Sequence, residues 1–405
     1  MPTRPSAECA PTLFLAAAEN KSVAYAALLE TAMGNHASSK QAVLANQAAA
    51  DVWQSRTGVA AAETAFTFAL PIHNEERSLP SVLAALCASE IPSEAHITVA
   101  LMTNACSDSS AAIVQDFLAE LGQPYAFDKV PFDVYQDEGI AQPIMAIRSG
   151  AFEFVHLDTT TAGKANVLNV GNRLALALGH QVACSQDTNN WIEPDALACL
   201  FGDAQRRFFD KPDGTAMIYG HPVALFRDHP GSIYNKMQKR VEGMPVPAEE
   251  EKLCLPGWMM IWDTKWLAES GGVPHTATED FALAVLTRGM GRNIGLSTAR
   301  IWGYNISTLG DLLEAGKRFV RGELQLVEYW KGNEKMSKQV QTELLHSANF
   351  FRRFGDLIAR TRKQPLRLPV HLVHWMLWEV AYRQGIADFK ANPHSSTWAP
   401  ISSTK

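Results

Sequence analysis

A regular alternation of strand-like and helix-like segments between residues 65 and 187 constrains the fold more than any other feature. Short apolar runs such as "AFTFALPI" (residues 65–72) and "HITVALMT" (96–103) are typical of buried strands, and each is followed by helical apolar spacing. Further strands are predicted over 152–158 and 181–187, and helices over 75–89, 107–122 and 164–178. This order predicts an α/β fold with a mostly parallel sheet and helices packed on it.

The length of 405 residues, with 47% hydrophobic residues, allows a large core and about two structural units. Composition and pattern divide the chain as follows. We predict an Ala-rich helical extension over 1–63, the α/β domain over 64–330 with halves 64–190 and 191–330, a helical C-terminal region over 331–392 and a flexible tail over 393–405.

Charge and cysteine content exclude several classes of protein. The net charge is −6, with 36 basic and 42 acidic residues, so no basic field favours nucleic acid. The six cysteines form no CxxC pair, which argues against a zinc framework or a disulfide scaffold and suits a reducing compartment. We recognise neither a signal peptide nor a run of about 20 apolar residues that could span a bilayer. We therefore expect a cytoplasmic protein, at most peripheral on the inner face of a membrane.

Polar residues follow three of the predicted strands. "PIHNEE" (71–76), "TNACSDSS" (103–110) and "DTN" (187–189) come at strand ends, and Lys164 opens the helix between the last two. Ligands of parallel sheets bind at the carboxyl ends of the strands. A carboxylate beside amides, with a lysine, suits a diphosphate bound through Mg²⁺ or Mn²⁺, which prefer oxygen ligands. The alternative is that Asp187 caps a turn and Lys164 is a solvated residue at a helix start.

Five segments in order resemble family 2 glycosyltransferases, and the resemblance covers about residues 64–330. They correspond to that family's Pro-x-x-Asn-Glu strand end, second-strand Ser/Thr-Asp turn, Gly-Lys-x-x-x-Leu-Asn segment, Asp-x-Asp strand end and Glu-Asp motif. The segments are "FTFALPIHNEERSLPSVLAAL", "VALMTNACSDSSAAIV", "GKANVLNVG", "DTNNWIEPDAL" and "LPGWMMIWDTKWLAESGGVPHTATEDFALAVLTRGMGRNIG". The resemblance implies a GT-A fold with a Rossmann-like sheet, and transfer of a sugar from a nucleotide-diphosphate donor to an acceptor hydroxyl.

The resemblance also implies roles for individual residues on the donor side. Thr103 would stand near the base, Asp108 would brace that turn, and Asp187 and Asn189 occupy the two acidic positions of Asp-x-Asp, where Mn²⁺ or Mg²⁺ binds. The nucleoside pocket would be lined by Pro71, His73, Asn74 and Glu75, and the ribose and diphosphate would lie beside Lys164 and Asn169.

On the acceptor side, Asp280 matches the catalytic base of the family, with Glu279 beside it. A carboxylate within hydrogen-bond reach can take the proton of the attacking hydroxyl, and attack opposite the leaving group inverts the anomeric configuration. Glu279 would orient a neighbouring group. The alternative is that these acidic residues only favour the start of a helix.

Several positions depart from the family pattern. Asn189 replaces the second aspartate of Asp-x-Asp, and its neutral amide is a weaker metal ligand. Thr103 stands where many relatives have an aspartate, which leaves the nucleobase open. "AGKRFVRGELQL" (315–326) replaces the Gln-x-x-Arg-Trp motif of processive synthases, so we expect one sugar per acceptor. Arg318 and Arg321 either clamp the diphosphate or are solvated.

Two aromatic regions remain. In "LPGWMMIWDTKW" (255–266) we expect Gly257 and Trp258 to face the acceptor and the rest to be core. In the C-terminal region, basic residues between 352 and 367 precede a Trp-rich helix, which either lies on an anionic membrane surface or packs over the α/β domain. His371 and His374 are one turn apart, and we interpret them as packing or surface residues.

Two competing functions remain open. The first is a catalytically inactive GT-A scaffold that binds a nucleotide sugar, which Asn189 and Thr103 would suit. The second is a sugar-phosphate nucleotidyltransferase, which would need a Gly-rich, Arg-containing loop where this chain has "PIHNEE". The acceptor is a hydroxyl-bearing small molecule, glycan or lipid-linked molecule.

Overall fold

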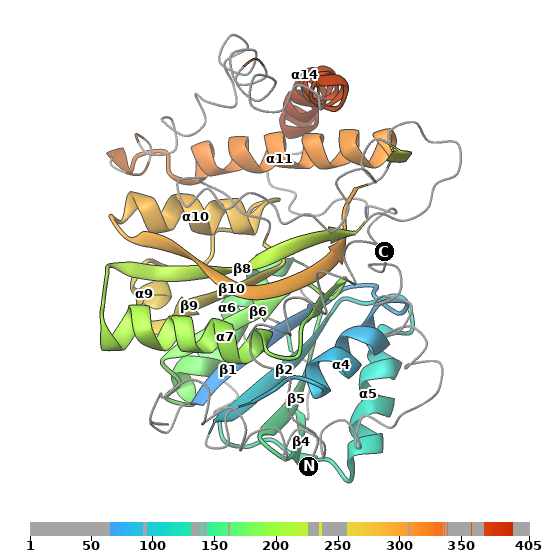
Figure 1. The fold of residues 1–405 in the computed structure, drawn as a ribbon, viewed down its shortest axis with the longest axis vertical. Coiled ribbons are helices and arrows are strands. Elements are labelled where there is room, and N and C mark those ends of the chain that lie inside the picture. The colour runs from blue at the N-terminus through green and yellow to red at the C-terminus, as the bar shows by residue number, and fades with distance from the viewer. Residues whose placement is uncertain are drawn as a thin grey trace, which may run out of the picture.

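The computed structural model describes residues 65–91, 95–130, 139–140, 144–160, 163–225, 235–236, 257–306, 308–334, 336, 338, 358 and 368–391. Within these residues, ten strands form one sheet in the order β3-β4-β5-β2-β1-β6-β9-β8-β10-β7, flanked by helices (Figure 1). The predicted α/β class is confirmed. The predicted extension over 1–63 and tail over 393–405 lie outside the described residues.

Four neighbouring strands run parallel in one half of this sheet, as the alternating pattern predicted. They are β5 (Phe152–Thr159), β2 (His96–Asn104), β1 (Ala65–Ile72) and β6 (Val182–Gln186). Their side chains are buried on both faces, which accounts for the nearly continuous apolar runs in the sequence. Because the strands are parallel, the polar residues that follow them lie along one edge of the sheet.

Antiparallel strands flank this parallel group on both sides, which the sequence pattern had not indicated. On one side β4 pairs antiparallel with β5 and with β3, and on the other β9 pairs antiparallel with β6 and β8. Beyond them β8 and β10 are parallel, and β7 is antiparallel to β10. Their bounds are β3 (Tyr125–Ala126), β4 (Met145–Ser149), β7 (Asn190–Ile192), β8 (Thr215–Leu225), β9 (Met259–Asp263) and β10 (Asn293–Tyr304).

One face of the sheet is covered by α4 (Leu79–Cys87), α5 (Ser110–Leu121) and α7 (Ala196–Ala204), which continues as a π-helical turn, η3 (Gln205–Asp210). Aromatic contacts join this layer to the strands. Phe201 stacks on Phe66 with ring centroids 4.3 Å apart, and Phe117 meets Phe154 edge to face at 5.1 Å.

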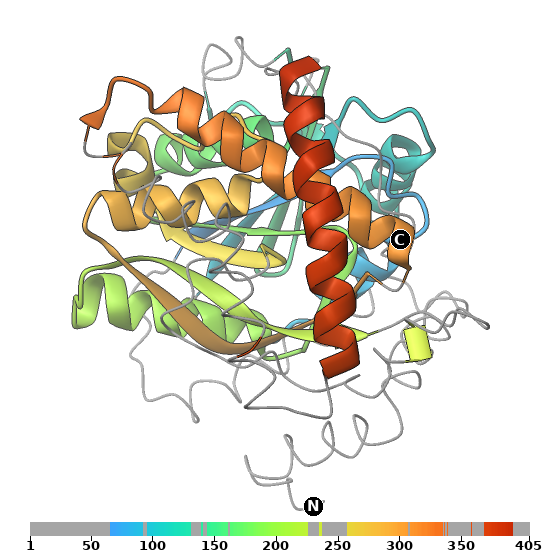
Figure 2. The same cartoon turned by 90° about the horizontal axis from the view of Figure 1, so that it is seen from above.

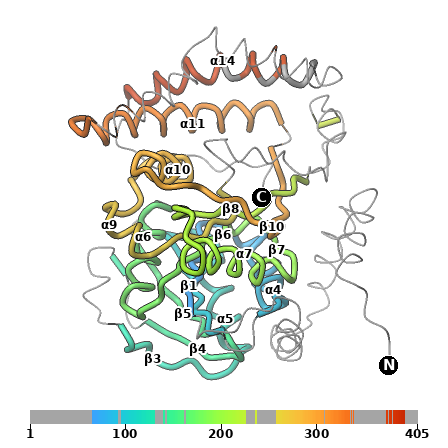
Figure 3. Tube along the Cα trace, turned by 60° about the vertical axis from the view of Figure 1, so that its left-hand side comes forward, coloured from blue at the N-terminus to red at the C-terminus, as the bar shows by residue number. Residues whose placement is uncertain are grey.

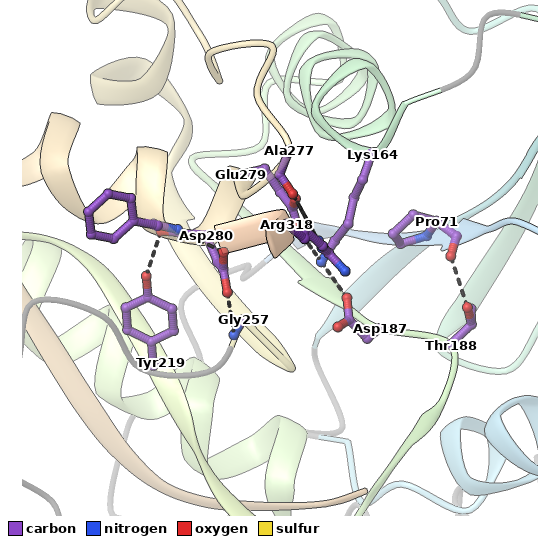
Figure 4. Close-up of polar contacts among 11 residues, drawn as sticks. Pro71, Lys164, Asp187, Thr188, Tyr219, Gly257, Ala277, Glu279, Asp280 and Arg318 are labelled. Atoms are coloured by element: carbon purple, nitrogen blue, oxygen red, sulfur yellow. Dashed lines mark hydrogen bonds and ion pairs between the residues drawn. The ribbon is translucent and has the colours of Figure 1, made fainter. Parts of the chain in front are cut away.

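The opposite face is covered by α6 (Lys164–Ala177), α9 (Thr264–Glu269) and α10 (Glu279–Gly289). Its core contains the buried Trp262, whose Nε1–H donates to Asn172 Oδ1 at 2.9 Å. Since α6 and α10 both begin at the edge where the parallel strands end, their first residues face that edge together (Figure 4).

A further layer lies outside α10. The long helix α11 (Leu309–Tyr329) runs beside α10, and α14 (Leu368–Ala391) crosses the outer side of α11 (Figures 2 and 3). Gly385 allows this crossing, because a Cβ there would lie 2.8 Å from the Cβ of Val320. In the described part of the chain, no helix is both long and apolar enough to cross a membrane.

Candidate functional site

The loops that follow β1 and β2 hold each other at the edge of the sheet. Asn74 adopts a left-handed φ of 55°, and its Oδ1 accepts the backbone N–H groups of Ser107 at 2.8 Å and Asp108 at 3.3 Å. In the reverse direction, Asp108 in the loop after β2 accepts the N–H of Glu76 on its Oδ2 at 3.0 Å. The structure therefore gives Asn74 and Asp108 a bracing position between the two loops.

The other residues of "PIHNEE" also make contacts along this edge. The carbonyl of Pro71 accepts the hydroxyl of Thr188 at 3.0 Å, and His73 Nδ1 lies 2.6 Å from the carbonyl oxygen of Asn104. The backbone N–H of Glu75 donates to Ser110 Oγ at 2.8 Å. These bonds tie β1 to both neighbouring strand ends, so the edge is a connected rim.

Lys164 brings together residues that are far apart in the sequence. Its ammonium forms a short ion pair with Asp187 and a second one, 2.7 Å long, with Glu279 (Figure 4). The three side chains are 18%, 28% and 3% exposed, respectively. Burial alone would lower the pKa of Lys164, but the charges of Asp187 and Glu279 outweigh it and raise that pKa. Lys164 is therefore a permanent cation at this point.

The two adjacent carboxylates at the start of α10 have different surroundings. Burial would raise the pKa of Glu279, but Lys164 and Arg318, whose guanidinium is 3.9 Å away, hold it below its ordinary value. Burial raises the pKa of Asp280, and the charge of Glu279 raises it further. The backbone amides at the start of a helix lower the pKa of a nearby carboxylate. At Asp280 the effects of burial and of the Glu279 charge are larger than this lowering. Asp280 is thus the stronger base of the two.

The carboxylate of Asp280 is fixed in orientation. Its Oδ2 accepts the N–H of Gly257 at 3.1 Å and its Oδ1 accepts the N–H of Phe281 at 2.8 Å. A Cβ at residue 257 would lie 2.5 Å from the Cβ of Asp280, so only glycine permits this approach. Tyr219, on β8, donates its hydroxyl to the backbone carbonyl of Asp280 at 3.1 Å, a contact that no sequence signal had indicated.

Trp258 follows Gly257 at the same point of the rim. Its backbone carbonyl accepts the N–H of Asp187 at 2.9 Å, and its side chain is partly buried against the core. Tyr304 also packs against this core and meets Trp191 edge to face at 5.3 Å. The predicted acceptor residues therefore lie between Asp187 and Asp280.

Asp187 and Asn189 offer oxygen ligands for a divalent cation. Burial raises the pKa of Asp187, against the opposing charge of Lys164, which is bonded to its Oδ1. Asn189 Oδ1 is buried and has no hydrogen-bond partner among the residues that the structure describes. Among the residues described, no three His, Cys, Asp or Glu side chains come together as a metal-binding group. The donor set therefore fits a cation that takes further oxygen ligands from substrate and water.

The segment before α10 is held from two helices. The amide of Asn169 on α6 bonds to both backbone groups of Val273, accepting the N–H at 2.7 Å and donating to the carbonyl at 3.1 Å. On α11, Gln325 Oε1 accepts the N–H of Ala277 at 2.7 Å, and Arg318 Nε donates to the same residue's carbonyl at 2.9 Å. These three side chains fix the backbone that carries Glu279 and Asp280.

Arg318 and Arg321 of the predicted clamp lie in different surroundings. Arg318 lies beside Glu279 in the group formed by Lys164 and Asp187. Burial lowers the pKa of Arg321, while the charge of Asp388 on α14 opposes that shift. The structure therefore associates Arg318 with the rim and Arg321 with α14.

Thr103, at the end of β2, contacts two residues of β5. Its hydroxyl donates to Asp158 Oδ1 at 2.7 Å and lies 2.9 Å from His156 Nε2. The sequence predicted a strand that ends at Asp158, but nothing in the sequence singled out Asp158 or His156 as site residues. Their importance depends on the pairing of β2 with β5, which the sequence alone does not specify.

Comparisons with known proteins found similarity only to solved structures, and at low sequence identity. No family model matches the sequence, and no curated protein matches it. Among solved structures, the mannosyltransferase PcManGT from Pyrobaculum calidifontis, in complex with GDP-Man and Mn²⁺, is 14% identical, with 94% of this chain and 88% of that chain covered and a TM-score of 0.41.

S. aureus TarS, solved as residues 1–349 in complex with UDP-GlcNAc, is 13% identical over 80% of this chain and 92% of that chain, with a TM-score of 0.37. The same fragment in complex with UDP is 14% identical over 84% and 95%, with a TM-score of 0.36. Scores this low carry no argument about chemistry.

Proposed function

We propose that this protein is a family 2 glycosyltransferase of the GT-A type, which moves one sugar from a nucleotide-diphosphate donor to an acceptor hydroxyl with inversion. The observation that carries the proposal is the convergence of Lys164, Asp187, Glu279 and Asp280 at the carboxyl edge of the sheet. Three separate motif segments meet there, and this edge is where α/β sheets bind their ligands.

On the donor side, the diphosphate would lie against Lys164 and Arg318, whose positive charges offset its negative charge. Asp187 and Asn189 would hold Mn²⁺ or Mg²⁺, because they supply a carboxylate and a buried amide oxygen that has no hydrogen-bond partner in the described part of the chain. A bound divalent cation supplies Lewis-acid stabilisation of charge on the leaving phosphate. His73 and Glu75 would lie beside the nucleoside.

On the acceptor side, Asp280 would act as general base. The acceptor oxygen forms a bond to the anomeric carbon while its proton passes to the Asp280 carboxylate, and the sugar–phosphate bond breaks with its electron pair leaving on the nucleoside diphosphate. Burial and the charge of Glu279 raise the pKa of Asp280, which strengthens it as a base. The N–H groups of Gly257 and Phe281 aim it, and each oxygen keeps a second lone pair for the acceptor.

Two alternatives make different predictions. An inactive scaffold would bind a nucleotide sugar without turnover. A sugar-phosphate nucleotidyltransferase is disfavoured, since it would need a Gly-rich phosphate loop at "PIHNEE". Here the segment is instead hydrogen-bonded to the loop after β2 through Asn74 and Asp108.

We further propose that α14, with the basic segment before it, contacts an anionic membrane surface, which would suit a lipid-linked acceptor.

The test is a panel of nucleotide sugars incubated with the protein and Mn²⁺, with donor hydrolysis and thermal shift both measured. A binding donor raises the melting temperature in proportion to the logarithm of its saturation. Stabilisation with hydrolysis supports the proposal, and stabilisation without hydrolysis or transfer to any acceptor supports the scaffold. Absence of both effects with every donor contradicts the proposal.

A further inference from the structure

Asp158 is a carboxylate at the rim that the proposed mechanism does not use. It lies opposite Thr103 in the parallel register of β5 and β2, and Thr103 lies opposite Ile72 of β1. The Thr103 hydroxyl has one proton and donates it to Asp158 Oδ1 at 2.7 Å. His156 Nε2, 2.9 Å from the same hydroxyl, must therefore donate to it. Burial lowers the pKa of His156, which keeps the ring neutral and consistent with an Nε2–H tautomer.

These hydrogen bonds orient the Asp158 carboxylate through only one of its two oxygens, Oδ1. Thr103 is fully buried and cannot move easily, so Asp158 Oδ1 is pinned to a fixed point. Asp158 itself is exposed. Among the residues that the structure describes, none hydrogen-bonds to its Oδ2, which can accept a hydrogen bond from a ligand. A pre-oriented carboxylate binds an N–H donor more selectively than a mobile one.

The backbone that follows β2, beside Asp158, is strained. Ala105 follows β2 with φ of 48°, a left-handed conformation that costs a non-glycine residue about 1–2 kcal/mol. Its N–H bonds to the carbonyl of Thr159 at 2.8 Å, and the chain then turns toward β1, where Cys106 Sγ contacts the carbonyl of Ile72 and Ser107 bonds to Asn74. The loop thus bonds to β1, while residues 139–140 pair with the end of β5 at Thr159 and Thr160, and the Asp158 side chain between them remains exposed. Backbone strain such as that at Ala105 concentrates at functional sites.

Asp158 is also at a useful distance from the proposed diphosphate position. The strands between them are neighbours in the order β5-β2-β1-β6. At about 4.8 Å per strand, three spacings separate the end of β5 from the end of β6 by roughly 14 Å. An extended nucleoside diphosphate has this reach from the base to its second phosphate. With the phosphates at Lys164 and Asp187, the base arrives at β5.

We propose that Asp158, held by Thr103, accepts a hydrogen bond from the ring N–H of the donor's base, so that the protein prefers uracil or guanine nucleotides to cytosine or adenine nucleotides. This inference rests on the proposed function and adds the class of base to it. Uracil and guanine carry a ring N–H on the edge that would meet Asp158 Oδ2. Cytosine and adenine present a ring-nitrogen lone pair at this edge. Two acceptors would then face each other, and Asp158 Oδ2 would have no N–H to bind.

The experiment measures the dissociation constants of UDP, GDP, CDP and ADP by calorimetry with Mn²⁺ present. For the wild type we expect UDP or GDP to bind at least about 10-fold more tightly than CDP and ADP, the scale of one charge-assisted hydrogen bond. Asp158→Asn presents an N–H in place of the free oxygen. It should weaken UDP or GDP binding about 10-fold or more and leave CDP and ADP unchanged or tighter.

Asp116→Asn is the matched control, because Asp116 is exposed on α5 and the variant makes the same change of charge away from the rim. Thr103→Val should also reduce the preference for UDP or GDP, since it releases Asp158 while keeping its charge. Equal binding of all four nucleotides by the wild type, or an unchanged preference in Asp158→Asn, overturns the base assignment and leaves donor binding intact. If none of the four binds, the proposed function and this inference both fail.

Discussion

At the scale of single residues, the central prediction concerns Asp280. Asp280→Asn keeps the size of the side chain and an oxygen that can accept one of the two N–H groups, from Gly257 or Phe281, but removes the basicity. Donor affinity should therefore be retained, while transfer falls by roughly 10²-fold or more. Single-turnover transfer at saturating donor measures this loss, with Asp116→Asn as the control. Turnover near the wild-type rate would move the role of base to another carboxylate at the rim.

The pH dependence of the reaction tests the same residue in another way. A base must be deprotonated, so the rate should fall as pH decreases through the pKa of Asp280, which burial and Glu279 place above the ordinary range for aspartate. Glu279→Gln removes a negative neighbour and should shift the acidic limb of the kcat profile to lower pH. The profile is measured from about pH 4 to 9. If the acidic limb stays in place or moves to higher pH, Glu279 does not raise the pKa of the group that titrates in the profile.

A third residue-scale prediction concerns the cation site. Asp187→Ala should abolish Mn²⁺-dependent donor binding, and Asn189→Asp should tighten Mn²⁺ binding, because a second charged oxygen is a stronger ligand than an amide. Calorimetric titration with Mn²⁺ measures both, and circular dichroism confirms that the variants are folded. Wild-type metal affinity in Asn189→Asp would place that amide outside the coordination shell.

The sequence predicted the residues of the rim better than it predicted their partners. Lys164 and Asp187 follow recognisable strand and helix boundaries, so both could be identified before the structure. The ion pairs of Lys164 with Asp187 and Glu279, and the hydrogen bond by which Thr103 holds Asp158, depend on strand order and register. Those are properties of long-range packing, and no local pattern in the chain encodes them.

At the scale of helices and strands, α11 acts as a brace for the start of α10. Gln325 and Arg318 hold the N–H and the carbonyl of Ala277. Gly322 lets α11 approach, because a Cβ there would lie 2.1 Å from Thr278 Oγ1. The sequence analysis compared residues 315–326 with a motif that is absent here and predicted no bounds for this helix. Of β9 the sequence predicted only that its residues belong to the core, and its antiparallel direction could not be predicted because a strand's composition does not depend on its orientation.

This brace leads to a prediction about Gln325. Gln325→Met removes the acceptor of the Ala277 N–H and should lower the free energy of unfolding by about 1–3 kcal/mol, the cost of an unsatisfied buried donor. If the brace also positions Asp280, kcat should fall several-fold while the donor dissociation constant stays near that of the wild type. Gln115→Met, at an exposed position on α5, is the matched control. A loss of stability with unchanged kcat would limit Gln325 to a structural role.

At the scale of the whole molecule, α14 is the outermost layer, and its two sides differ. Ala381 and Gly385 are buried against the rest of the protein, while Leu372, Met376 and Val380 form an exposed apolar stripe with a spacing of four residues. Packing on α11 and contact with a membrane are therefore compatible, because they use different sides of the helix. The basic segment between 352 and 367 lies mostly outside the described residues and contributes charge of the sign that anionic lipids attract.

We therefore predict that the protein co-sediments with vesicles containing phosphatidylserine at low salt. About 1 M salt should release it, because the screening length falls to about 3 Å and the electrostatic attraction is lost. Replacing Leu372 and Met376 together by Gln should reduce binding at low salt, since both apolar side chains would insert at the interface. Gln115→Ala, at an exposed position on α5 away from α14, should bind as the wild type does. Equal sedimentation of the double variant would show that the stripe does not touch lipid, and a soluble acceptor would then be favoured over a lipid-linked one.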